Sequence, residues 1–271
     1  MELEGLVLSV ATDYSTVLGL VQADIANFTF DDPAQVASML ATIIWQAKHS
    51  QDGIADSALA KALKTNRNLS PFMLAWADAS EYGLLSQTLA LSVITQAADI
   101  PDGYSQMLYQ VARRAGICTT FGLTPAMMFT FLSNPAWFGV TDTSIDFNLI
   151  YLFSRYADWL KLTPKEDDVL AYLGWVNSDS APSVDKAAKV LAVLLNWDSD
   201  QVKQAAMHAN EADGIACDLQ QVDTVMRLLT LCTNAQTSVE TILNVAALTT
   251  TSGYSAWQTV GESLIAAQVS D

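Results

Sequence analysis

The sequence predicts an all-α fold in which short antiparallel helices form an irregular helical-repeat or orthogonal-bundle arrangement. Apolar residues recur every three or four positions almost everywhere, which is the spacing of a helix face buried against a core. Alternating β-branched runs between Asn-Gly or Asp-Gly turns, which would indicate strands, are missing. Four stripes show the helical spacing: Val36, Leu40, Ile43 and Ala47; Ile145, Leu149, Leu152 and Tyr156; Val184, Ala187, Leu191 and Leu194; and Trp257, Val260, Leu264 and Ala267.

Helix starts give the second line of support. A polar N-cap side chain accepts a free backbone N–H, and a proline directly after it supplies the helical φ angle where its missing N–H costs nothing. Four such pairs predict helix starts: Asp32-Pro33, Ser70-Pro71, Thr124-Pro125 and Thr163-Pro164. Asp198, Asp218 and Ser238 are predicted to cap helices without a proline.

Helix ends are predicted at three glycines. Gly83, Gly116 and Gly174 follow helical stretches, and glycine is favoured in the left-handed conformation just past a helix. Arg113 and Arg114 would complement the negative end of the helix that closes at Gly116. These signals predict about twelve helices, mostly about 10 to 16 residues long and joined by short turns.

The chain shows a recurring unit but no strict repeat. The motif Leu-[Ser/Thr]-Pro occurs three times, at Leu69, Leu123 and Leu162, and the intervals between its copies are unequal. A weak break in the helical pattern lies between Ser133 and Ser144. We therefore expect two helical lobes, residues 1–140 and 141–271, with a single domain as the alternative.

The composition limits the kinds of partner. The chain has 271 residues, is 51% hydrophobic and only 15% charged, and its mean hydropathy is +0.24. Such a chain is either a piece of something larger or a self-contained helical domain with a large core, and composition leaves both open. The net charge is −16, and the few cations are spread thinly, so a nucleic acid or an anionic membrane would be repelled. We expect neither as a partner.

Targeting signals are not apparent. The segment Met1 to Gly5 is acidic where a signal peptide would be basic. The most apolar stretches, Leu84 to Ile94 and Val190 to Leu195, are shorter than the roughly 20 residues that cross a bilayer. Three cysteines, Cys118, Cys217 and Cys232, form no Cys-x-x-Cys pair, so we expect reduced and mostly buried thiols.

No motif for catalysis, cofactor binding or metal binding is found. His49 is predicted to end a helix and His208 to lie within one, and neither has a second ligand at metal-binding spacing. The run from Glu166 to Asp168 is predicted to occupy the first turn of a helix, where negative charge is stabilised. Asp198-Ser199-Asp200 lacks the glycine and the glutamate of a calcium loop, so an N-cap is preferred. We therefore expect no catalytic, cofactor or metal residues.

The seven tryptophans are interpreted mainly as packing residues. Trp45, Trp76, Trp137, Trp159 and Trp257 are expected in the core. Trp175 and Trp197 each follow a leucine-rich helix and precede a polar turn, so their indoles are expected to fill elbows between helices. The alternative is an exposed aromatic platform for a ligand.

The sequence resembles a known family in its second half. A helix that ends in Leu-Asn-Trp and runs through an acidic turn into another helix, at Leu195 to Val202, looks like the A subunits of bacterial insecticidal toxin complexes, the Tc toxins. The order of the later segments is also similar to the end of that family's helical shell. Those segments are Gln221 to Leu229, Ser238 to Leu243, Tyr254 to Gln258 and Ala266 to Gln268. The resemblance is strongest over residues 160–271.

The resemblance implies a structural role. Tc toxin A subunits are large pentamers whose helical shell surrounds a translocation channel, and they work with B and C subunits. The chain is too short for a whole subunit, so we expect a shell segment that contacts other domains of the same subunit and does not itself insert into a membrane. It would be released from bacteria within a toxin complex, after a cytoplasmic stage and without an N-terminal signal.

The function predicted from the sequence is a non-enzymatic structural segment of a Tc-type A subunit, in the helical shell around the pore. The alternative is a stand-alone helical-repeat module that binds a protein or a peptide in a concave groove.

Overall fold

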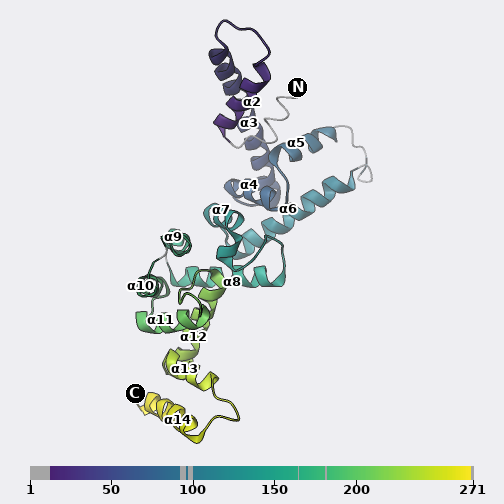
Figure 1. The fold of residues 1–271 in the computed structure, drawn as a ribbon. Coiled ribbons are helices and arrows are strands. Elements are labelled where there is room, and N and C mark those ends of the chain that lie inside the picture. The colour runs from purple at the N-terminus through teal and green to yellow at the C-terminus, as the bar shows by residue number, and fades with distance from the viewer. Residues whose placement is uncertain (1–12, 92–95, 97–99, 164, 181, 270–271) are drawn as a thin grey trace. The chain divides into compact units, whose positions relative to one another are not determined.

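The computed structural model describes residues 13–91, 96, 100–163, 165–180 and 182–269. Over these residues the chain forms thirteen α-helices and two short 3₁₀ helices, and no strand (Figure 1). The all-α prediction is therefore confirmed. Three predicted features fall outside the described residues: Pro164, the segment from Met1 to Gly5 and the last part of the apolar stretch that ends at Ile94.

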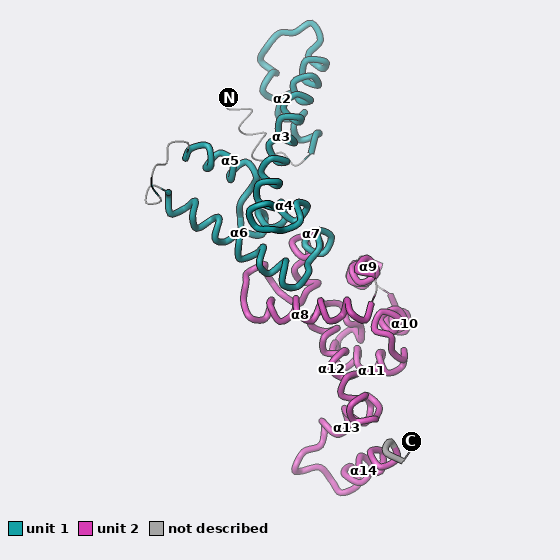
Figure 2. The backbone as a smooth tube through the Cα atoms, turned by 180° about the vertical axis from the view of Figure 1, so that it is seen from behind, with its two compact units in different colours: residues 1–128 teal, residues 129–271 magenta. Residues whose placement is uncertain are grey.

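The chain divides into two compact units, residues 1–128 and 129–271 (Figure 2). In the first unit the elements are α2 (Tyr14–Ile25), α3 (Pro33–Leu63), η1 (Arg67–Leu69), α4 (Ser70–Trp76), α5 (Glu81–Ala90) and α6 (Asp102–Phe121). Helix α7 (Pro125–Ser133) begins in this unit and ends in the second. The second unit continues with η3 (Pro135–Phe138), α8 (Phe147–Leu162), α9 (Glu166–Val176), α10 (Val184–Leu195), α11 (Ser199–Ala209), α12 (Leu219–Ala235), α13 (Val239–Ala246) and α14 (Tyr254–Val269).

Helices α2 and α3 form a hairpin with a small core of its own. Val17, Val21 and Ile25 from α2 pack against Ala37 and Ala41 from α3. The two alanines let the helix backbones approach closely, because they place no larger side chain between them. The second half of α3 packs against η1, α4 and α5 instead.

Elsewhere in the first unit, polar side chains tie helices together through backbone carbonyl groups. The hydroxyl of Ser70, which is buried, donates to the carbonyl oxygen of Asp56 at 3.1 Å. The guanidinium of Arg114 donates from Nε to the carbonyl oxygen of Trp76 at 2.7 Å and lies over the ring of that tryptophan. The carbonyl oxygen of Trp76 lies at the end of α4, where carbonyl groups of a helix commonly bond to groups outside it, whereas that of Asp56 lies inside α3.

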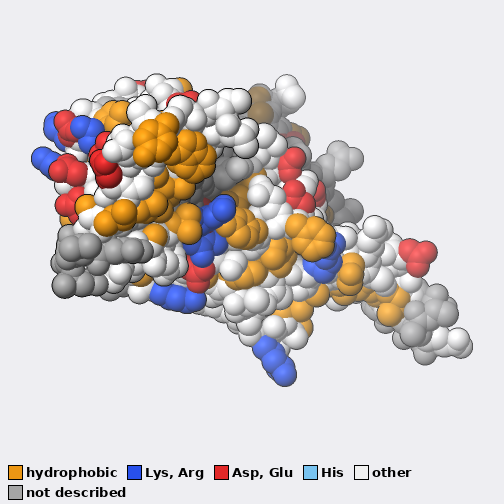
Figure 3. Space-filling model, turned by 90° about the horizontal axis from the view of Figure 1, so that it is seen from below, with side chains coloured by type: hydrophobic (Ala, Val, Ile, Leu, Met, Phe, Trp, Pro, Cys, Tyr) orange, Lys and Arg blue, Asp and Glu red, His pale blue; other side chains and the backbone are white. Residues whose placement is uncertain are grey.

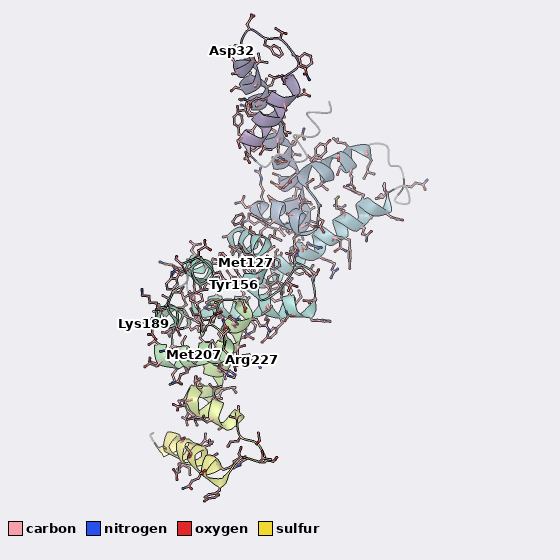
Figure 4. The ribbon with its side chains drawn as sticks, viewed as in Figure 1. Asp32, Met127, Tyr156, Lys189, Met207 and Arg227 are labelled. Carbon is pink, nitrogen blue, oxygen red and sulfur yellow. The ribbon has the colours of Figure 1, made fainter. Side chains whose placement is uncertain are left out.

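The core of the second unit is aromatic and is built around α8. The ring of Phe131 meets those of Phe138 and Phe153 edge to face, with centroids 5.5 and 5.2 Å apart. Tyr156 lies one turn after Phe153 on α8 (Figure 4), and the centroid of its ring is 6.1 Å from that of Phe138. Trp159 continues the row against Tyr172 of α9 at 6.3 Å. Edge-to-face pairs of this kind add to the stabilisation from burial alone.

The turn after η3 brings α12 close to the backbone. Gly139 has a φ angle of 77°, and a Cβ at this position would lie 2.7 Å from the Cβ of Gln220. Only glycine fits such a left-handed turn under a neighbouring helix.

Most predicted helix starts are confirmed. The side chains of Asp32, Thr124, Asp198, Asp218 and Ser238 accept backbone N–H groups from the first turns of their helices. Two are wrong. Ser70 already lies inside α4 and bonds to α3, and Thr163 ends α8, where its buried hydroxyl donates to the carbonyl oxygen of Leu194.

All three predicted glycine helix ends are wrong. Gly83, Gly116 and Gly174 lie inside α5, α6 and α9, respectively. Helix α6 continues to Phe121, so Arg113 and Arg114 are not in its last turn. The left-handed residues that do end α-helices are Lys64, Gly122, Asn196 and Gln236.

The predicted stripes are confirmed on α8 and α10 and are partly wrong on α3 and α14. Leu149, Leu152 and Tyr156 on α8 are fully buried, as are Ala187, Leu191 and Leu194 on α10 to within a few per cent. On α3, however, the predicted core residues Leu40 and Ile43 are exposed. On α14, Val260 is buried and Trp257 is exposed, and the side chain of Ala267 is not among those that the structure describes. Helices α3, with 31 residues, and α6, with 20, are longer than expected.

A buried carboxylate joins α8 to α12. Asp223 on α12 is only 3% exposed, and it accepts hydrogen bonds from the hydroxyl of Tyr151 at 2.6 Å and from Nε of Arg155. Arg155 also pairs with Asp158 one turn further along α8. The charge of Asp223 is therefore compensated by two donors from one neighbouring helix.

Replacing Asp223 with Ala should lower the free energy of unfolding by about 3 kcal/mol, because Arg155 and Tyr151 would lose a buried partner. Chemical denaturation followed by circular dichroism measures this loss. Asp185→Ala removes the exposed pair with Lys203 and serves as the control, for which we expect no measurable change. Equal stabilities of the two variants would contradict the structural role of Asp223.

Candidate functional site

The two histidines lie on different helices, α3 and α11. His49 lies in the middle of α3 rather than at a helix end, and its ring is tilted by 57° against that of Trp45, with centroids 4.3 Å apart. His208 lies in the last turn of α11, where a cation suits the helix dipole. In the part of the chain that the structure describes, no group of three His, Cys, Asp or Glu side chains could hold a metal ion. The expectation of no catalytic, cofactor or metal residue stays a prediction.

The three cysteines are free thiols. Burial raises the pKa of Cys118 to about 12, and it raises the pKa values of Cys217 and Cys232 as well. A thiol that keeps its proton at neutral pH is a poor nucleophile. Cys118 and Cys232 are buried among apolar side chains, whereas Cys217 is only partly buried.

The carboxylates that the sequence singled out are placed as caps and first-turn charges. Glu166, Asp167 and Asp168 occupy the first turn of α9, and Glu166 accepts a hydrogen bond from the buried hydroxyl of Tyr156 at 2.9 Å. Asp198 caps α11 through the N–H groups of Asp200 and Gln201. These contacts account for both sets without an acid–base role.

A carboxylate cluster in the first unit was not anticipated. Burial raises the pKa of Asp56 on α3 to about 6, with further contributions from the negative charges of Glu81 on α5 and Asp52 on α3, against the opposing charge of Arg67. Burial and Asp52 also raise the pKa of Glu81, while its own backbone N–H and Lys48 oppose the rise. Sequence reasoning missed this cluster because Asp56 and Glu81 come together only when α5 packs on α3.

Trp197 borders a pocket where the ends of α8 and α10 meet α12. The pocket has a volume of about 470 Å³. Its lining combines apolar side chains with amide, hydroxyl and ammonium groups. The lining residues are Lys161, Leu162, Leu195, Asn196, Trp197, Met226, Leu229, Thr230, Thr233 and Asn234. Trp197 is 36% exposed. Its indole was expected to fill the elbow between two helices, and it does so only in part.

Trp175 lines a second, more open groove between α9 and α10. This groove has a volume of about 600 Å³, and its lining is mostly apolar, with Tyr172, Val190 and Val193 beside the indole. Asp168 adds a negative charge and Lys189, labelled in Figure 4, adds a positive one. The two tryptophan sites can receive apolar or amphipathic groups of a partner, but neither gathers a nucleophile and a base.

Apolar side chains reach the surface in broad areas with few charges among them (Figure 3). Phe147 is 95% exposed, and Val193, Tyr254 and Phe28 are also largely exposed. These four side chains lie on different elements, at Phe28 after α2 and on α8, α10 and α14.

Over the described residues, no single helix has the length and apolar character needed to span a membrane. Helices α6 and α7, which meet at a bend of 120°, satisfy that criterion only as a pair and only by length and composition.

The raised pKa of Asp56 predicts a pH dependence of stability. Its folded pKa of about 6 lies above the ordinary value of 3.8, so the ionised side chain destabilises the fold above pH 6, and this effect disappears as the pH falls from 6 towards 4. Asp56→Asn should therefore stabilise the protein at pH 7.5 by about 1 to 2 kcal/mol, since water screens part of the effect, and should change little at pH 4. Urea unfolding at both pH values measures this. Asp24→Asn, on the exposed side of α2, is the control. A gain in the free energy of unfolding for Asp56→Asn that is the same at both pH values would contradict the prediction.

The partial exposure of Trp197 predicts a moderate role in stability. Trp197→Ala should lower the free energy of unfolding by about 1 to 2 kcal/mol, because only part of the indole is removed from water. Trp159→Ala, at a fully buried position, should cost about 3 to 5 kcal/mol. Thermal or chemical unfolding compares the two variants. Losses of equal size would show that Trp197 is a core residue.

Comparison with known proteins supports the resemblance found in the sequence. No family model matches the chain. The chain is 26% identical over 242 residues to "Toxin subunit YenA1" of Yersinia entomophaga, a match that covers 85% of this chain and 21% of the relative. The chain thus spans about a fifth of the length of this curated relative. The match extends well beyond residues 160–271, over which the motifs were most specific. The chain is therefore similar over most of its length to part of a Tc toxin A subunit, in agreement with the resemblance seen in the sequence.

Proposed function

We propose that the chain is a non-enzymatic structural segment of a Tc-type toxin A subunit, in the helical shell around the translocation pore. One observation carries the proposal: an all-helical chain aligns over 85% of its length with a fifth of a toxin subunit. In this role the chain supplies packed helices and no chemistry. The proposal keeps the two helical lobes, residues 1–140 and 141–271, the second being the end of the shell.

The surface supports a role within a larger assembly. Large apolar side chains are exposed on α2–α3, α8, α10 and α14. Only 15% of the residues are charged, so few charges oppose the contact of such surfaces with other proteins. The partners proposed on this basis are other domains of the same subunit, further copies in a pentamer, and the B and C subunits. Release from bacteria within the toxin complex is part of the same proposal.

A stand-alone protein-binding module is the second candidate. The open apolar groove between α9 and α10 favours it, because such grooves accept the apolar face of a helix or an extended peptide. A binding module would work with its core intact and without any toxin particle.

The proposal is tested by purifying toxin particles from the bacterium that encodes this chain. We expect the chain to copurify with the particles, and electron cryomicroscopy to place it in the helical wall outside the channel. Leu152→Asp, which puts a charge into the core of the second unit, should prevent particle assembly, while Lys186→Gln on the exposed side of α10 should not. Particles that lack the chain, or that assemble and deliver their cargo with Leu152→Asp, would contradict the proposal.

A further inference from the structure

The first half of α3 has two apolar sides, and the described chain covers one of them. Ala37 and Ala41 are fully buried against α2. Met39 and Ile43, one turn apart, are 59% and 60% exposed, and Leu40 beside them is 38% exposed. We call Met39, Leu40, Ile43 and Ile54 the outer seam of α3; Ile54, further along the helix, is 61% exposed.

The outer seam has the spacing of a helix-packing surface. Val36, Leu40, Ile43 and Ala47 follow one another at alternating steps of four and three, and Ser50 and Ile54 continue the series. This alternation keeps one narrow stripe facing a second helix over several turns. The sequence predicted the first four of these residues to face a core, yet Leu40 and Ile43 are exposed in the chain by itself.

The surroundings of the seam are uncharged. Residues 33–47 contain no Asp, Glu, Lys or Arg, although the whole chain has a net charge of −16. The side of a helix that faces water normally carries charged residues. The absence of charge on every side of this stretch therefore indicates that its outer side is also covered, and that the covering surface is itself neutral and apolar.

The architecture of the hairpin gives a third, independent reason. The buried cluster of α2 and α3 contains side chains from these two helices alone. A stable helical layer normally packs against a second layer, as in four-helix bundles, because two helices bury too little apolar surface by themselves. The hairpin lacks that second layer within the described residues.

We propose that the outer seam of α3 binds a helical segment of the toxin subunit that lies outside this chain, and that this segment presents an uncharged apolar stripe of the same spacing. The inference rests on the proposed function. Most of the related toxin subunit lies outside the region that matches this chain, so that subunit holds ample chain to supply the second layer. The neutrality of the seam selects an apolar helix over an acidic or basic one.

Thiol accessibility tests the proposal. Ile43→Cys is made in a Cys217→Ser background, because Cys217 is the one native cysteine that is not buried. Cys at position 43 should react with a maleimide quickly in the isolated chain and at least about tenfold more slowly in purified toxin particles. Asp24→Cys on the exposed side of α2 is the matched control, whose rate should change less than about twofold. Circular dichroism of the isolated variants checks that both are folded.

A second variant tests the same surface without labelling. Ile43→Lys should reduce incorporation of the chain into particles at least about tenfold, because it buries a charge in the neutral contact, whereas Asp24→Lys should not. Equal reactivity at position 43 in the isolated chain and in particles that contain the chain overturns this inference alone. A disulfide between two copies through position 43 in the isolated chain assigns the seam to a second copy and also overturns it. Absence of the chain from the particles overturns the proposed function and this inference together.

Discussion

The second unit depends on a row of fully buried aromatic side chains along α8. Phe153, Tyr156 and Trp159 stand on one side of this helix and contact aromatic residues of α7, η3 and α9. Each large ring fixes the position of a neighbouring element, because an interior packed at crystal density leaves little room for another arrangement. The hydroxyl of Tyr156 is satisfied by Glu166, so the same residue also fixes the start of α9. The other side of α8 is held by the bonds of Tyr151 and Arg155 to Asp223.

Polar residues in this chain serve mainly to end, start and join helices. Asp and Ser side chains cap α2, α3, α5, α8, α11, α12 and α13. Buried hydroxyls reach across to carbonyl groups of other helices, as Thr163 does to Leu194 and Tyr172 to Ala216. This use of polar groups accounts for many of the carboxylates in this acidic chain. Asp56 and Glu81 differ from these residues, because burial raises the pKa values of both, and the negative charge of Glu81 adds to the rise at Asp56.

The surface of the chain exposes apolar side chains on several helices. The outer seam of α3, the groove between α9 and α10 and the exposed rings of α14 all leave apolar area in water. Burial of apolar area is favourable wherever a partner of matching shape is present. In the function proposed above, neighbouring domains of a longer toxin subunit cover these surfaces.

The sequence by itself determined the fold class, five helix starts and the relationship to Tc toxin A subunits. N-caps such as Asp218 were predictable because a cap bonds to backbone N–H groups two or three residues away, so the signal is local. Only the tertiary structure decided where helices end. Gly116 costs a helix about 1 kcal/mol, and packing of α6 outweighs this cost, so the helix continues to Phe121. The tertiary structure also decided which stripe of α3 is buried, because both of its sides are apolar and periodicity cannot choose between them. The exposure of Trp197 and the meeting of Asp56 with Glu81 depend in the same way on contacts between helices distant in the chain.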